Sequence, residues 1–166
     1  NRAKAIRLKF DGRHAAITVN GATGVTTNGT WAADAASDAL NVTTDSVNYR
    51  KGGGSVNFDV TVAQSANDFA QISNSTMSAV DLSDEANQAI FVMEVFIPLV
   101  TNISSFTLRW GSSAAAYWSR TVTTQINGGA LQTGWNTLAF DWSVATETGS
   151  VDETAINYLL FRVTYS

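Results

Sequence analysis

The feature that most constrains the fold is a two-residue rhythm of apolar and polar side chains. It runs through "SVNFDVTV" (55–62), "SFTLRW" (105–110), "NTLAFDW" (136–142) and "NYLLFRVTY" (157–165). Because successive side chains of a strand point to opposite faces, this period predicts half-buried β-strands. The side chains that we expect to face a core are Val56, Phe58, Val60, Val62, Phe106, Leu108, Trp110, Leu138, Phe140, Trp142, Leu159, Phe161, Val163 and Tyr165.

Turn signals separate these segments at short intervals, among them Asn20-Gly21 and Asn127-Gly128-Gly129. Many short strands with close turns predict an all-β fold, an antiparallel β-sandwich of jelly-roll type. The run "AIFVMEVFI" (89–97) is apolar on both faces and predicts a central strand. The stretch Thr30 to Val47 has no clear period, so it is either a surface excursion or a pair of weak strands around Trp31.

The beginning of the chain has its own pattern. "AIRLKFDGRHAAITV" (5–19) predicts a hairpin that turns at Asp11-Gly12, a residue pair typical of tight hairpins. We therefore expect one domain over 1–166, with a hairpin or arm at 1–20 and the jelly roll at 30–166. The hairpin either lies on the sandwich or extends toward a neighbouring subunit.

Composition narrows the classes of partner. The formal net charge is −4, and a nucleic-acid-binding domain would be basic. No apolar run reaches the roughly 20 residues that span a bilayer, so no membrane insertion is expected. There is no cysteine, and charged residues are only 14%, which leaves a surface rich in Ser, Thr and Asn. This composition favours an extracellular location on a virion or cell surface.

Catalytic candidates are few. His14 is the only histidine and lies beside the predicted hairpin turn, without a nucleophile motif. A pair of carboxylates could hydrolyse glycosides, with Glu94 as the best candidate and Asp59, Asp141 and Glu147 as the others. No spacing pairs any two carboxylates, and an outward or arginine-paired Glu94 is the ordinary alternative. We therefore expect no enzyme activity.

Three consecutive glycines, Gly52 to Gly54, precede the strand at 55–62. Lys51 comes before them and a strand follows, so they do not form a phosphate-binding loop. Two interpretations remain: a corner that needs positive φ angles, or a loop whose carbonyls bind Ca²⁺ together with aspartates. The candidate metal ligands are Asp34, Asp38, Asp45 and Gly52.

Aromatic residues near predicted loops and strand ends are candidates for stacking on sugar rings. Core or rim packing is the alternative for each of them. The four candidates are Trp118, Trp135, Tyr117 and Trp31.

Several segments together resemble a known type of sequence, the galactose-binding-like jelly roll of carbohydrate-binding modules. The similarity is greatest to modules of uncharacterised phage structural proteins and bacterial surface proteins, and it covers about Trp31 to the end. That resemblance implies a non-catalytic module, often with structural Ca²⁺ and sometimes with a glycan site on the concave face or the loops. The segments are "NYRKGGGSVNFDV", "AVDLS", "VFIP", "LRWGSSAAAYWS", "GWNTLAFDWS" and "TGSVDETAINYLLFRV".

Two functions follow as expectations. The first is a structural or adhesive β-sandwich on a virion or cell surface, with surface glycans as its candidate ligands. The second is an architectural subunit that assembles with copies of itself or with neighbouring structural proteins, through the hairpin and an exposed last strand. A glycoside hydrolase on the same fold is a third, less favoured expectation.

Overall fold

The computed structural model describes residues 17–60 and 68–166, and these form an antiparallel β-sandwich. The predicted all-β fold is therefore confirmed. Every helix among the described residues is far too short to cross a membrane. The described elements are β1 (Trp31–Ala33), β2 (Ala39–Asp45), β3 (Ser55–Val60), β4 (Phe69–Asn74), β5 (Ile90–Ile97), β6 (Ile103–Ser113), β7 (Ala116–Val122), β8 (Gly134–Asp141), the 3-10 helix η1 (Trp142–Val144), β9 (Thr146–Thr148), the 3-10 helix η2 (Glu153–Ala155) and β10 (Tyr158–Tyr165).

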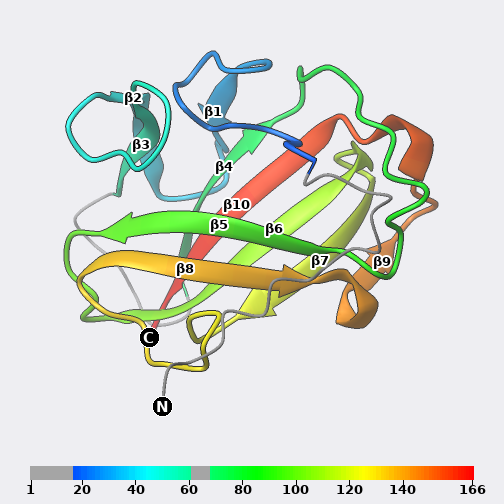
Figure 1. Ribbon diagram of the computed structural model, residues 1–166. Helices are drawn as coiled ribbons and strands as arrows, with labels where there is room; N and C mark the ends of the chain where they lie inside the picture. Colours follow the sequence, from blue (N-terminus) through cyan, green and yellow to red (C-terminus); the bar gives the residue numbers. More distant parts are fainter. Residues whose placement is uncertain (1–16, 61–67) are drawn as a thin grey trace.

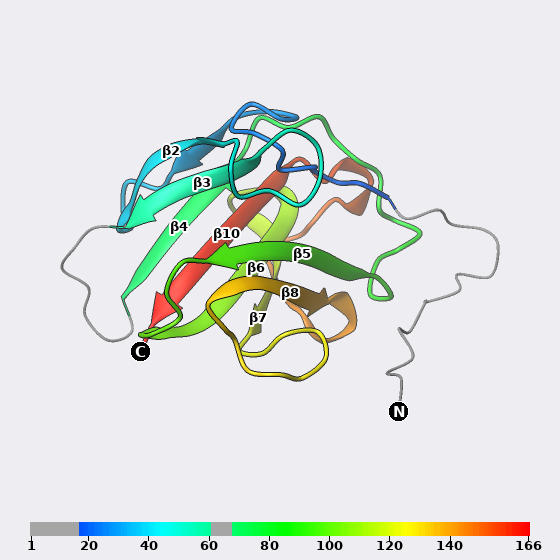
Figure 2. The same cartoon turned by 60° about the vertical axis from the view of Figure 1, so that its left-hand side comes forward.

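One layer of the sandwich is a single sheet, and the other is divided into two small sheets. One is a six-stranded sheet in the order β1-β4-β10-β6-β7-β9, and all of its strand pairs are antiparallel. The other consists of two separate two-stranded sheets, β2–β3 and β5–β8. Figure 1 shows β5 and β8 across the front of the large sheet, and β2 and β3 beside its β1 and β4 strands. The second layer is thus interrupted between β3 and β5 (Figure 2).

The core lies between the layers and is rich in aromatic rings. Trp110, Phe140 and Trp142 are fully buried, and the two tryptophan rings meet edge to face at 5.5 Å. Such pairs add stabilisation beyond the area that they bury. The predicted inward positions of β6, β8 and β10 are confirmed, but Val60 at the end of β3 is 37% exposed. Val62 lies outside the described residues.

The prediction that 89–97 is a central strand is wrong. Within the described part of the chain, β5 pairs only with β8. Its inward side chains reach the core, whereas Val92 is 59% exposed on the opposite face. Among the described residues, the apolar residues on both faces of β5 therefore belong to a strand with one neighbour and an exposed outer face.

The prediction that the last strand is an exposed edge is also wrong. β10 pairs with β4 on one side and with β6 on the other, at the centre of the large sheet. Leu160 on its outer face is 1% exposed and lies opposite Arg109 of β6 in the register. The sheet edges in the described chain lie elsewhere.

Two further expectations have different outcomes. The stretch Thr30 to Val47 contains β1 and β2, so the strand interpretation of this region is confirmed. Most of the predicted hairpin, including its turn at Asp11-Gly12, lies outside the described residues.

Candidate functional site: a polar row and a cleft

A row of polar and aromatic side chains crosses the outer face of the six-stranded sheet. Strand register places these residues opposite to Phe106, Leu108 and Trp110, which face the core. The row comes from β7, β6, β10, β4 and the turn after β1. We call it the outer row, and it consists of Tyr117, Arg109, Tyr158, Arg162, Gln71 and Asp34.

Short contacts connect the members of the outer row. Arg109 lies over the ring of Tyr117, with its guanidinium carbon 4.5 Å from the ring centroid. The Arg162 Nε donates to Gln71 Oε1 at 2.8 Å, and the Gln71 Nε2 donates to Asp34 Oδ2 at 2.6 Å. The hydrogen-bonded section fixes the Arg162 guanidinium, which also lies over the ring of Phe69 at 4.1 Å. Such held rotamers are preorganised for binding.

Burial and charge act together in this row. Burial raises the pKa of Tyr158, and the positive charge of Arg109 opposes that rise. Burial, followed by the like charge of Arg109, lowers the pKa of Arg162. Two guanidinium groups therefore lie close enough to repel each other, with Asp34 as the carboxylate of the row. An anion at this face would relieve that repulsion.

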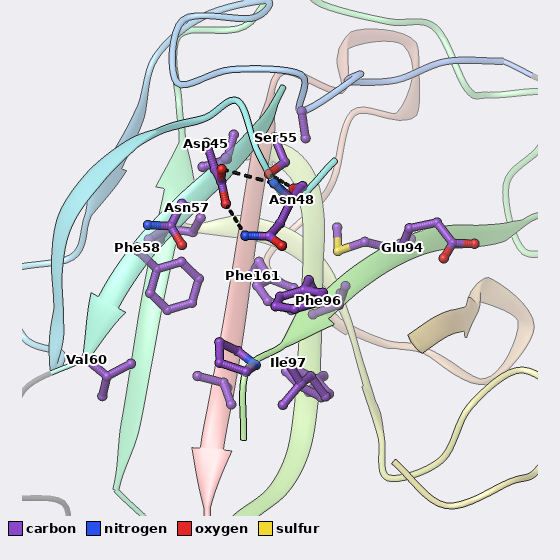
Figure 3. A pocket seen from close by; sticks show the side chains of 18 of the residues that line it. Asp45, Asn48, Ser55, Asn57, Phe58, Val60, Glu94, Phe96, Ile97 and Phe161 are labelled. Atoms are coloured by element: carbon purple, nitrogen blue, oxygen red, sulfur yellow. Dashed lines mark hydrogen bonds between the residues drawn. The ribbon is translucent and has the colours of Figure 1, made fainter. Parts of the chain in front are cut away.

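A cleft of about 450 Å³ separates β3 from β5 in the interrupted layer. Its floor is the inner face of the large sheet and includes Ile72, Phe106 and Phe161. Figure 3 shows Phe58 of β3 and Phe96 of β5 on either side, with Asp45 at the polar end. The cleft thus has an apolar floor and a polar rim.

Two donors in the cleft lining have no hydrogen-bond partner among the described residues, the indole Nε1 of Trp31 and the hydroxyl of Tyr165. Both side chains are more than nine-tenths buried. Burial, followed by the charges of Asp38 and Asp68, raises the pKa of Tyr165 to about 12. Because buried polar groups are nearly always hydrogen-bonded, these two donors indicate an acceptor that is not among the described contacts.

The structure distributes the four predicted glycan-binding aromatics over different places. Tyr117 belongs to the outer row. Trp135 lies at the cleft, in edge contact with Phe96 at 5.4 Å and beneath Arg50 at 5.1 Å. Trp31 is only 4% exposed, and Trp118 packs inward on Trp142 at 6.0 Å. These four residues therefore do not form one sugar-binding platform.

The four predicted metal ligands fall into two pairs at opposite ends of β2. Asp34 and Asp38 precede this strand, whereas Asp45 ends it and is followed by the loop that contains Gly52. Seven strand residues span roughly 20 Å, too far for one ion to bind both pairs. Among the described residues, no three His, Cys, Asp or Glu side chains converge as metal ligands would. Calcium binding stays a prediction.

The glycine loop is a corner. Gly52 has φ of +75°, and a Cβ there would lie 2.6 Å from Thr23 Cγ2. The carboxylate of Asp45 is bonded within its own turn. It accepts hydrogen bonds from the backbone N–H groups of Val47 and Asn48 and from the Asn48 side chain. These bonds lower the pKa of Asp45. The geometry therefore accounts for the glycines without a ligand.

The two carboxylates considered for hydrolysis stand on opposite walls of the cleft. Asp59 on β3 accepts from Asn41 Nδ2 at 3.0 Å, and Glu94 on β5 accepts from Thr137 Oγ1 at 2.8 Å. Both side chains are exposed. They therefore lack the enclosed, apolar surroundings of a catalytic carboxylic acid. His14 lies outside the described residues.

Comparison with known proteins gives no match to a family model, a curated protein or a solved structure.

Sequence reasoning missed Arg109, Arg162, Gln71 and Tyr158, which meet only through strand pairing between distant parts of the chain. The available signal was the polar residues at outward positions of "SFTLRW" and "NYLLFRVTY".

Proposed function

We propose that this chain is a non-catalytic β-sandwich module of a virion or cell surface that binds glycans through the outer row. The observation that carries the proposal is the continuity of the row across neighbouring strands, from Tyr117 to Asp34. A sugar presents both ring faces and hydroxyl groups. The row offers an aromatic ring, planar guanidinium groups and an amide within one surface, and a few placed polar groups of this kind fix the orientation of a ligand.

The charge of the row favours glycans with acidic sugar units. The row contains two guanidinium groups, those of Arg109 and Arg162, and one carboxylate, Asp34, which accepts a hydrogen bond from Gln71. A planar guanidinium binds a carboxylate through two parallel hydrogen bonds. The resemblance to carbohydrate-binding jelly rolls agrees with this proposal.

The test is binding to an array of neutral, uronic-acid-containing and sialylated glycans. Arg109→Ala and Tyr117→Ala are expected to lower affinity at least tenfold. Arg50→Ala serves as the matched control, because it removes one positive charge beside Trp135 at the cleft instead. Full binding by both outer-row variants, with Tm unchanged, would contradict the proposal.

A second candidate function is an architectural subunit that assembles with copies of itself. An apolar stripe on the outward face of the β5–β8 sheet favours it, formed by Ile90, Val92 and Phe96, which are 37%, 59% and 38% exposed. Exposed apolar surface of this kind often marks an interface. Sedimentation of wild type against Val92→Glu distinguishes the two functions: assembly predicts oligomers that the variant lacks, and the adhesive module predicts no difference.

A further inference from the structure

We infer that the cleft lined by β3 and β5 binds a small cationic amphiphile, a molecule with a positively charged head and an apolar body that carries an ester or amide oxygen. The volume of the cleft, about 450 Å³, lies within the range of small-molecule sites, about 300–1,000 Å³. The cleft is on the core side of the six-stranded sheet, opposite to the outer row. The inference therefore does not depend on glycan binding.

The interior of the cleft is apolar. In Figure 2, β4 and β10 are seen between β3 and β5, and they supply Ile72 and Phe161 to the cleft floor. Phe58 of β3 and Phe96 of β5 stand on either side (Figure 3). A ligand that packs on such a lining removes apolar surface from water, which favours binding. The body of the ligand is therefore apolar.

The site is elongated, with a polar end and an apolar end. Figure 3 shows Asp45 at the end of the cleft away from Val60. At the other end, a second hollow of about 330 Å³ shares Val60 and Tyr165 with the cleft. This hollow adds Leu99, whose side chain is 66% exposed. An amphiphile has the same division, with a head at one end and an apolar chain at the other.

The charge of the rim selects the head of the ligand. The carboxylates of the described lining are those of Asp45, Asp59 and Glu94, and lysine, arginine and histidine are absent from it. Hydrogen bonds within its turn lower the pKa of Asp45, which keeps this carboxylate ionised. Arg50 lies over Trp135 at 5.1 Å and adds one positive charge beside the cleft. Three carboxylates outnumber it, so the rim attracts a cationic head and repels an anionic one.

Two buried donors select an oxygen atom in the apolar body. The indole Nε1 of Trp31 and the hydroxyl of Tyr165 belong to side chains of the lining and have no hydrogen-bond partner among the described residues. A purely hydrocarbon occupant would leave both donors unpaired, which is costly for buried groups. A carbonyl oxygen accepts hydrogen bonds from such donors. An acyl ester or amide of an amine therefore fits the cleft better than an alkylamine.

The test is calorimetric titration of the protein with three probes below their micellar concentrations. Decanoylcholine has an apolar chain, an ester and a cationic head. Decanoate has the same acyl chain with an anionic head, and decyltrimethylammonium has the cationic head without the ester. We expect decanoylcholine to bind at one site, decyltrimethylammonium to bind at least threefold more weakly, and decanoate at least tenfold more weakly.

Two results of this titration would overturn the inference. The first is decanoate that binds as tightly as decanoylcholine, and the second is no binding of decanoylcholine at millimolar concentration. Equal affinity of the two cationic probes would overturn the part that Trp31 and Tyr165 have in it.

A pair of variants locates the ligand. Val60 is 37% exposed where the cleft meets the second hollow, and Val144 in η1 is 54% exposed and outside both linings. We expect Val60→Trp to weaken decanoylcholine binding at least tenfold and Val144→Trp, the matched control, to leave it unchanged. Equal affinity of the two variants, with Tm unchanged, would overturn the inference.

The indole N–H resonances give a readout that needs no variant. Saturation with decanoylcholine should shift the indole N–H resonance of Trp31. The resonances of Trp110 and Trp142 should stay in place, because these indoles also lack a partner among the described residues but lie outside the cleft lining. A Trp31 resonance that does not move, or equal shifts of all three, would overturn the inference.

Discussion

Gln71 is the position where the outer row is most open to a quantitative test. Its side chain is 5% exposed and joins Arg162 to Asp34 through hydrogen bonds of 2.8 and 2.6 Å. A hydrogen bond to a charged group contributes about 1.5–3 kcal/mol, and the partial exposure of both partners places each bond at the low end. We therefore expect Gln71→Ala to lower the free energy of unfolding by about 2–4 kcal/mol.

The assay is urea unfolding combined with thermal melting. For a chain of this size the expected loss corresponds to a fall in Tm of about 5–15 °C. Gln71→Met keeps most of the volume and removes both hydrogen bonds, so it should retain at least half of the destabilisation. Gln88→Ala, at an exposed position, is the control and should stay within about 0.5 kcal/mol of wild type. A Gln71→Met protein as stable as the control would refute the claim that the hydrogen bonds hold the row.

Three further predictions concern the loop, the cleft and calcium. Gly52→Ala should destabilise by about 1–2 kcal/mol because of its positive φ and the contact with Thr23, whereas Gly53→Ala, with open space around it, should be neutral or slightly stabilising in urea unfolding. The pKa of Tyr165 is raised to about 12 in the folded state, so its contribution to stability is complete below pH 10 and is lost as the pH rises from 10 through 12. Over that range the Tm of wild type should fall more steeply with pH than the Tm of Tyr165→Phe. Equal slopes would count against a buried hydroxyl. If the predicted calcium site exists, 1 mM Ca²⁺ should raise Tm and EDTA should reverse the rise, because a ligand that binds only the native state stabilises that state. A Tm that neither Ca²⁺ nor EDTA changes would contradict the calcium prediction.

Alternation along single strands predicted much of the fold. Phe106, Leu108 and Trp110 face the core as expected, because the period of a strand is a local property. The same signal gave the inward residues of β10 but not the position of β5 or β10 within its layer. Runs that are apolar on both faces do not say whether a second layer, a neighbouring molecule or long side chains of the same sheet cover the outer face.

The candidate site could be predicted only in part. Tyr117 was named from its place near a strand start, but Arg162 and Gln71 are 91 residues apart and meet through the pairing of β10 with β4. Register between distant strands depends on how whole faces pack, and no short motif records it. The metal prediction drew its ligands from sequence proximity, and β2 separates them into two pairs.

The most direct test of the central claim is to map amide chemical shifts while an acidic oligosaccharide is added to the labelled protein. The proposal predicts shifts concentrated on the outer face, at Arg109, Tyr117 and Arg162 and their strand neighbours in β4 and β6. Shifts confined to β3 and β5 around the cleft, or none at millimolar oligosaccharide, would contradict it.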